Sequence, residues 1–180
     1  MAIIKPNNNT ISAITALPAA ITTGKVLQVV SQFYDTQTST TGSSYVATAL
    51  TANITPSSTS NKILASFYTS ISGADNGYIA FKMFRDSTEI GSSTNTWTGE
   101  ECFVGYCSSN SGNSSYAAPP LAIVHLDSPS STSEITYKLQ FSPMRTSSNS
   151  CILNRSYNLG DNNQFRTSSR LILMEIAGWL

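Results

Sequence analysis

Apolar and polar residues alternate with a period of two through most of the sequence after Gly24. The segment EITYKLQF, residues 134–141, does so without a fault. One side carries Ile135, Tyr137, Leu139 and Phe141, and the other carries Glu134, Thr136, Lys138 and Gln140. Successive side chains of a strand point to opposite faces, so this pattern predicts a half-buried β-strand.

Similar stripes recur along the chain and predict further strands with one apolar face. The stripes are Leu27, Val29 and Phe33 in 25–34 (opposite Gln28 and Gln32), Val46, Leu50, Ala52 and Ile54 in 45–54, Ile63, Ala65, Phe67 and Ile71 in 62–71, and Ile79, Phe81 and Met83 in 78–84.

Other segments are richer in apolar residues. LAIVHL, residues 121–126, is a continuous apolar run, which is typical of a central strand. In the segment 170–179, the pattern predicts Ile172, Met174 and Ile176 pointing inward and Glu175 pointing outward. Shorter strands are predicted within 101–107 and 150–157.

Clusters of Gly, Pro, Asn and Ser separate these runs, and no segment shows the period of an amphipathic helix. In ITPSSTSN, Pro56 ends one strand because it cannot donate to a ladder, and the polar run suits a corner between two sheets. The sequence therefore predicts an all-β protein, an antiparallel β-sandwich of jelly-roll-like type over residues 25–180.

Residues 1–24 show neither a two-residue nor a helical period and contain two prolines. Such a segment buries too little apolar surface to order itself, so it is predicted to be an extended N-terminal arm that orders against a partner. Asn7, Asn8 and Asn9 interrupt the apolar run that a signal peptide would need, so none is expected. No window approaches the roughly 20 apolar residues of a membrane-spanning helix.

The composition is polar without being ionic. The 180 residues include ten basic and ten acidic side chains, only 11% of the chain, beside 30 Ser and 21 Thr. A surface of this kind cannot neutralise a phosphate backbone or adhere to anionic lipid, so neither nucleic acid nor a membrane is an expected partner. One domain with a sizeable core fits this length.

The three cysteines, Cys102, Cys107 and Cys151, are an odd number and show no C-x-x-C spacing. This excludes the usual zinc and thioredoxin patterns and favours free thiols made in a reducing cytosol.

Candidate catalytic groups are few. His125 is the single histidine and shares a strand face with Asp127, as in an oriented hydrolase histidine, but no activated nucleophile accompanies it. Glu100 and Glu101 are the other clustered acids that a small glycan hydrolase or esterase could use. Ordinary strand and surface positions explain these residues better, so the sequence indicates a non-enzymatic protein without metal or cofactor.

Aromatic side chains among polar loop residues are the strongest binding signal. Trp97, Tyr106, Tyr116 and Tyr157 lie among Ser, Asn and Gly, a composition typical of recognition surfaces. They are candidate ligand-binding residues, and stacking on a sugar face would suit them. An equal alternative is that they pack onto the ends of the sandwich or into a subunit interface.

Three strings resemble a module of virion proteins from marine tailed bacteriophages, including cyanophages. They are ALPAAITTGKVLQVV (residues 16–30), ITPSSTSNKILAS (54–66) and LILMEIAGW (171–179), and their order covers most of the chain. Similar modules occur in tail fibres and in exposed capsid-fibre or decoration proteins. The strings specify strands and corners, not catalytic groups.

The resemblance implies a virion protein assembled in the bacterial host cytoplasm, commonly as a homotrimer. Residues 1–24 would then dock onto other virion proteins. The exposed sandwich would either bind a host surface glycan or receptor, as a tail fibre does, or decorate the capsid. A lectin-like cellular protein is a further alternative.

Overall fold

The computed structural model describes residues 25–42, 44–73, 78–93, 102–107, 117–144, 150–157 and 165–178. Every regular element in these ranges is a β-strand, and they contain no helix. The predicted arm, residues 1–24, lies outside the described residues.

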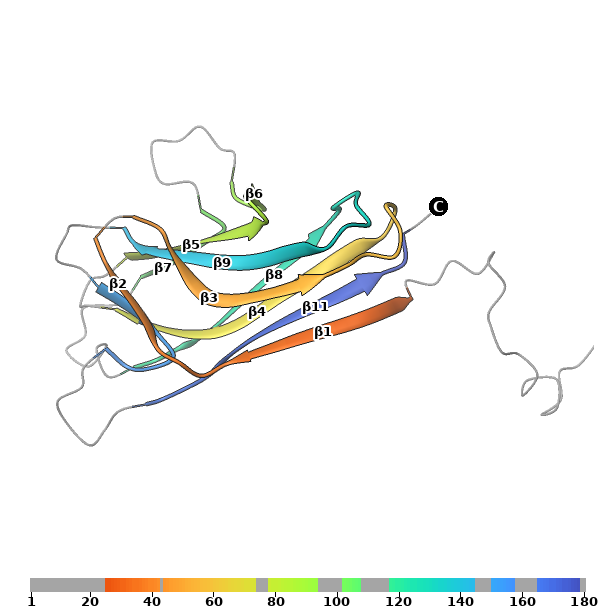
Figure 1. Cartoon of the computed structure of the whole chain (residues 1–180). Helices are drawn as coiled ribbons and strands as arrows, with labels where there is room; N and C mark the ends of the chain where they lie inside the picture. Colours follow the sequence, from red (N-terminus) through yellow and green to blue (C-terminus); the bar gives the residue numbers. More distant parts are fainter. Residues whose placement is uncertain are drawn as a thin grey trace, which may run out of the picture.

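The strands form two antiparallel sheets, which lie as two layers in Figure 1. The six-stranded sheet has the order β1-β11-β4-β10-β2, with β8 pairing with β4; its strands are β1 (Val26–Tyr34), β2 (Thr38–Thr41), β4 (Lys62–Gly73), β8 (Pro120–Asp127), β10 (Ser150–Leu153) and β11 (Ser169–Ile176). The five-stranded sheet has the order β3-β9-β5-β6, with β7 pairing with β5; its strands are β3 (Val46–Ile54), β5 (Tyr78–Arg85), β6 (Thr88–Ile90), β7 (Val104–Cys107) and β9 (Ile135–Pro143). The predicted antiparallel β-sandwich is confirmed.

The core lies between the two sheets and consists of the predicted apolar stripes. The inward residues of β9 are all buried, as the alternation predicts. The stripes of β4 and β5 are buried as well, and the Phe81 and Phe141 rings stack at 6.3 Å between centroids. In β3, Leu50, Ala52 and Ile54 are buried as predicted, whereas Val46 is exposed although it pairs with the buried Phe141. The register of the strand shifts between Ala47 and Thr51, where Ala49 has a φ of 59°.

The predicted orientation of the last strand is wrong. In β11, Leu171, Leu173 and Glu175 face the core and are buried, whereas Ile172 and Met174 lie half-buried on the outer face. Both faces of this strand are apolar, so the period of two does not distinguish inside from outside. Glu175 points inward, contrary to the expectation for a charged residue, because hydrogen-bond donors surround its buried carboxylate.

Two further expectations about strand position need correction. The run 121–126 forms β8, which pairs with β4 alone among the described strands, so it lies at an edge and is not central. In β1, the stripe of Leu27, Val29 and Phe33 faces outward and is exposed, whereas Val30 and Tyr34 pack against the core. The short strands β2 and β6 were not predicted at all.

The polar run after Pro56 forms the predicted corner between β3 and β4, and it also completes a buried polar cluster. The Glu175 carboxylate accepts hydrogen bonds from the Ser57 backbone N at 2.6 Å, the Ser57 Oγ at 2.8 Å and the Asn61 Nδ2 at 2.5 Å. Its second oxygen accepts from Gln28 Nε2 of β1 at 2.6 Å. Gly178 donates to Asn61 Oδ1, and a side chain at Gly178 would collide with the Ser60 backbone. The corner thus holds the end of β11 in place through hydrogen bonds to Glu175 and Gly178.

Candidate functional site

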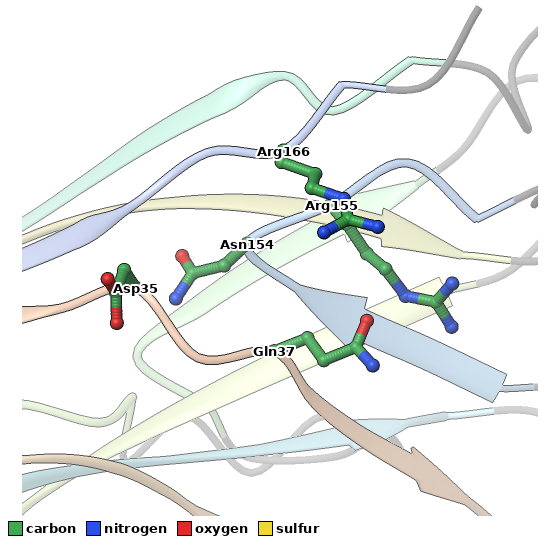
Figure 2. A pocket seen from close by; sticks show the side chains of 5 residues that line it. All are labelled: Asp35, Gln37, Asn154, Arg155 and Arg166. Atoms are coloured by element: carbon green, nitrogen blue, oxygen red, sulfur yellow. The ribbon is translucent and has the colours of Figure 1, made fainter. Parts of the chain in front are cut away.

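A polar cleft of about 260 Å³ lies in the six-stranded sheet, where the connection between β1 and β2 meets the segment after β10. Its lining residues all have polar side chains, and Figure 2 shows them: Asp35, Gln37, Asn154, Arg155 and Arg166. Two guanidiniums and one carboxylate give the lining a net positive charge. Most ligand pockets are lined by apolar side chains with a few polar groups, so this all-polar lining suits only a polar or charged ligand.

Asn154 fixes the geometry of the cleft. It is buried, and its φ of 65° is a left-handed conformation that Asn tolerates better than most residues. Its Nδ2 donates to the carbonyls of Tyr34 at 3.2 Å and Thr36 at 3.0 Å, and its Oδ1 accepts from Ser169 Oγ at 2.5 Å. One amide thereby ties the β1–β2 connection to β10 and β11.

The two arginines face each other across a short antiparallel pairing. Arg155 and Arg166 form an isolated β-bridge, and Ser156 bonds to Phe165 on one side of it while Asn154 bonds to Thr167 on the other. Residues directly opposite in an antiparallel pair hold their Cβ atoms about 5 Å apart, where like charges repel. The fold therefore brings two arginine side chains to the same part of the cleft.

The hydrogen-bond donors of Arg155 are also incompletely paired. Within the part of the chain that the structure describes, its Nε and Nη1 atoms are buried and have no hydrogen-bond partner. Leaving one buried donor unpaired costs about 1–3 kcal/mol, and more where the donor is charged. No ion pair of Arg155 or Arg166 occurs among the described residues. The described residues therefore leave the Arg155 guanidinium without a compensating charge.

The opposite end of the cleft has different chemistry. Asp35 and Gln37 are exposed and come from the β1–β2 connection. In Figure 2 the Asp35 carboxylate lies at the far end from the Arg155 guanidinium, with Asn154 between them. A carboxylate accepts hydrogen bonds from hydroxyl groups, and an amide both donates and accepts. The cleft therefore has a carboxylate acceptor at the end opposite Arg155, and in Figure 2 the Gln37 amide extends toward the Arg155 side.

The predicted aromatic residues are only partly described. Trp97 and Tyr116 lie outside the described residues. Tyr106 belongs to β7, where its backbone pairs with Ile79, and its side chain is not among those described. Tyr157 is half-buried and follows the cleft residue Arg155 by two positions. A shared aromatic surface therefore stays a prediction.

The possible hydrolase pair does not have the arrangement of a catalytic dyad. Asp127 accepts both Arg85 Nη1 at 2.9 Å and Tyr137 Oη at 2.7 Å, which occupies its two oxygens. His125 instead packs edge-on against the Phe103 ring, with 5.7 Å between centroids. Burial and the hydrogen bond to Asp127 raise the pKa of Tyr137 far above its ordinary value, so it stays a neutral donor. Glu100 and Glu101 lie outside the described residues.

Neither a metal cluster nor a membrane-spanning helix is found in the described ranges. They contain no group of three or more His, Cys, Asp and Glu side chains placed to hold a metal ion. They also contain no helix long and apolar enough to cross a membrane. Cys151 is buried, and burial raises the pKa of its thiol to about 12.

A second notable surface is the outer face of the six-stranded sheet, formed by the outward side chains of β8, β4, β11 and β1. Cross-strand pairing aligns Leu126, Leu64, Met174 and Val29 in one row across all four strands. Val29 and Leu126 are at least half exposed. The neighbouring outward positions include the apolar Tyr68, Val124, Phe33, Ile172 and Ile176. Ser31 and Ser66 lie among them, in the row with Val124 and Ile172.

Comparison with known proteins finds distant structural matches but no match by sequence. No family model matches the chain, and no curated protein matches it by sequence. Among solved structures, the VP2 subviral particle of infectious bursal disease virus matches with 11% identity and a TM-score of 0.40, over 84% of this chain and 38% of VP2. T=1 particles derived from a mutant VP2 protein of the same virus match with 10% identity and a TM-score of 0.39, over 91% and 41%. The chain thus spans about two fifths of the length of these proteins.

The cleft residues were missed by the sequence reasoning. Asp35 and Gln37 are more than 115 positions away from Arg155 in the sequence, and strand pairing alone brings them together. A usable signal was the pair Arg155 and Arg166 in a chain with only ten basic residues, on either side of the polar sequence GDNN.

Proposed function

We propose that this protein is a non-enzymatic structural protein of a virion, exposed on the particle and carrying a site for a host surface glycan or receptor. One observation carries the proposal: the described sandwich separates an apolar outer sheet face from a polar cleft with unpaired positive charge. An assembled surface protein needs both kinds of surface, one for its neighbours and one for its ligand.

The outer face of the six-stranded sheet supports assembly with further copies of this chain. A contiguous exposed apolar patch on a folded domain marks an interaction surface. Among the described outward residues of its four strands, only Lys62 and Arg170 are charged, and Arg170 lies over the Phe33 ring at 5.6 Å. A face with so little charge can pack against an identical face without repulsion between like charges, so a second copy of this chain is a suitable partner. The homotrimer implied by the phage resemblance would use such a face.

The N-terminal arm is proposed to attach the assembly to other virion proteins. Residues 1–24 have the composition of a segment that orders on a partner. Deletion of these residues should leave the sandwich folded and abolish incorporation into particles. Normal incorporation of the truncated protein would disprove the anchoring role.

Host recognition is proposed for the cleft, together with the aromatic residues Trp97, Tyr106, Tyr116 and Tyr157. Tyr157 is the member of this set nearest the cleft in the sequence. Replacing Trp97 by Ala should weaken adsorption to host cells without changing the melting temperature. A lower melting temperature instead would assign Trp97 a structural role.

Capsid decoration is the alternative function, and the apolar outer face favours it because a coating protein packs against its neighbours. Immunogold labelling or cryo-electron microscopy of particles separates the two. Density at the tail supports host recognition, and density on the shell supports decoration. Absence from the particle would reject a virion protein and favour a lectin-like cellular protein.

An enzymatic function is tested separately. Incubation with host polysaccharide, followed by detection of new reducing ends, should give no turnover. Sustained release of reducing ends would instead identify a small glycan hydrolase.

A further inference from the structure

We propose that the cleft binds one acidic sugar unit, with the carboxylate of a uronic acid at Arg155 and Arg166 and its hydroxyl groups at Asp35 and Gln37. The inference deepens the proposed glycan-binding function and rests on it for the identity of the ligand as a sugar. It names the class of sugar and the residues that distinguish it from neutral ones.

The anionic part of the ligand follows from the two arginines. The backbone bridge sets Arg155 opposite Arg166, and the buried Nε and Nη1 of Arg155 have no hydrogen-bond partner within the described part of the chain. A planar guanidinium presents its N–H groups in a fork that matches the two oxygens of a carboxylate. Binding an oxyanion there would supply a countercharge to two arginines that have no ion pair among the described residues.

The hydroxyl-bearing part follows from the opposite end of the cleft. A simple inorganic anion would gain nothing from Asp35, whose charge would repel it. A ligand with a carboxylate and several hydroxyl groups fits the cleft. Asp35 accepts hydrogen bonds at the end far from Arg155, and the Gln37 amide, which extends toward the Arg155 side in Figure 2, donates and accepts them. The cleft of about 260 Å³ suits one sugar ring better than an extended oligosaccharide.

The cleft is prearranged for such a ligand. Asn154 is held by three hydrogen bonds of its side chain, and Ser72 Oγ donates to the Arg155 carbonyl at 2.7 Å. The backbone that carries the arginine is therefore fixed before the ligand arrives. Prearranged donors reduce the entropy that binding must overcome.

The test is an NMR chemical-shift titration of the full-length protein with sodium glucuronate, glucose and sodium sulfate at constant ionic strength. Glucuronate should shift the amide signals of Gln37, Asn154 and Arg155 in a saturable manner. Glucose lacks the carboxylate and sulfate lacks the ring hydroxyls, so each should bind at least tenfold more weakly. Equal binding of sulfate would overturn the sugar part of the proposal, and equal binding of glucose would overturn the anionic part. No saturable shift with any of the three would overturn the whole.

Variants assign the effect to the cleft. Arg155→Gln should weaken glucuronate binding about tenfold or more, since a hydrogen bond to a charged group contributes roughly 1.5–3 kcal/mol. Arg166→Gln, at an exposed position, should also weaken it and serves if Arg155→Gln does not fold. Arg170→Gln, on the outer sheet face, is the matched control and should leave binding unchanged. Unchanged affinity in both cleft variants would contradict the proposal.

This test and the test of the proposed function can fail independently. Particle imaging reports where the protein resides and does not depend on the sugar. Failure of glucuronate binding with density at the tail would reject the acidic ligand alone. Glucuronate binding by a protein absent from particles would reject the virion function and keep the site.

Discussion

Two charged side chains, the buried Glu175 and the half-buried Arg155, differ in how their buried polar atoms are hydrogen-bonded. The Glu175 carboxylate accepts four hydrogen bonds from three neighbours, whereas the buried Nε and Nη1 of Arg155 have no partner in the described part of the chain. A buried charge destabilises a fold unless donors or acceptors surround it. Glu175 is therefore structural, and Arg155 is the residue whose surroundings indicate a ligand.

Replacing Glu175 by Gln should lower the free energy of unfolding by about 2 kcal/mol, the order of one or two charge-assisted hydrogen bonds. An amide NH2 group would meet donors from Ser57, Asn61 or Gln28, and those bonds would be lost. Urea denaturation monitored by circular dichroism measures the change. Glu134→Gln, at an exposed position, is the matched control and should leave stability within about 0.5 kcal/mol.

The contribution of Glu175 should depend on pH. Burial would raise the pKa of this carboxyl, but the hydrogen bonds outweigh burial and hold the pKa below its ordinary value. A group whose pKa is lower in the folded state stabilises the fold above its unfolded pKa, about 4.3, and this stabilisation is lost as the pH falls through the folded pKa. The difference in melting temperature between the natural protein and Glu175→Gln should therefore be constant from pH 7 to 5 and shrink below about pH 4. A constant difference down to pH 3 would contradict the lowered pKa.

Cys151 should be unreactive in the folded protein. Its pKa of about 12 leaves almost no thiolate near neutral pH, and the thiolate is the reactive form. Labelling with iodoacetamide at pH 8, followed by mass spectrometry of the Cys151 peptide, should show modification only after denaturation. Rapid labelling of the native protein would indicate that this thiol reaches solvent.

At the scale of strands, the sequence predicted elements well wherever one face is clearly polar. Strand β9 alternates polar and apolar residues and was predicted with the correct face inward. Strands β8 and β11 were misjudged, one in its position and the other in its orientation, since both have apolar side chains on two faces. Periodicity cannot choose between two apolar faces. The deciding contact, Glu175 with Ser57 and Asn61, joins residues more than 110 positions apart in the sequence.

The orientation of β11 can be tested with two neighbouring residues. Leu173→Ala should destabilise the protein by about 2–5 kcal/mol because Leu173 lies in the core. Met174→Ala should cost about 1 kcal/mol or less because Met174 is half-buried on the outer face. Guanidinium denaturation of both variants compares them directly. Equal losses, or a larger loss for Met174→Ala, would support the orientation first expected from the sequence.

At the scale of the whole molecule, the two surfaces differ in how far they could be predicted. The outward row of Leu126, Leu64, Met174 and Val29 consists of apolar residues, but the sequence pattern predicts that Met174 and Val29 point inward. The cleft depends on Asn154, whose left-handed backbone turns the chain after β10 toward the β1–β2 connection. No local pattern encodes such a meeting of distant segments.

Self-association through the outer face of the six-stranded sheet gives the last prediction. The natural protein should behave as an oligomer of the 19.3 kDa chain, and Leu126→Lys should shift it toward the monomer. The lysine places a charge in an apolar contact between copies, at the β8 end of the row, where no acidic residue of the four described strands faces outward to pair with it. Size-exclusion chromatography with light scattering measures the mass. Thr51→Lys, at an exposed position in β3 of the other sheet, is the matched control and should leave the oligomer intact. A mass of 19.3 kDa for the natural protein at tens of micromolar would contradict assembly through this face, and an equal loss of mass in both variants would point to general destabilisation.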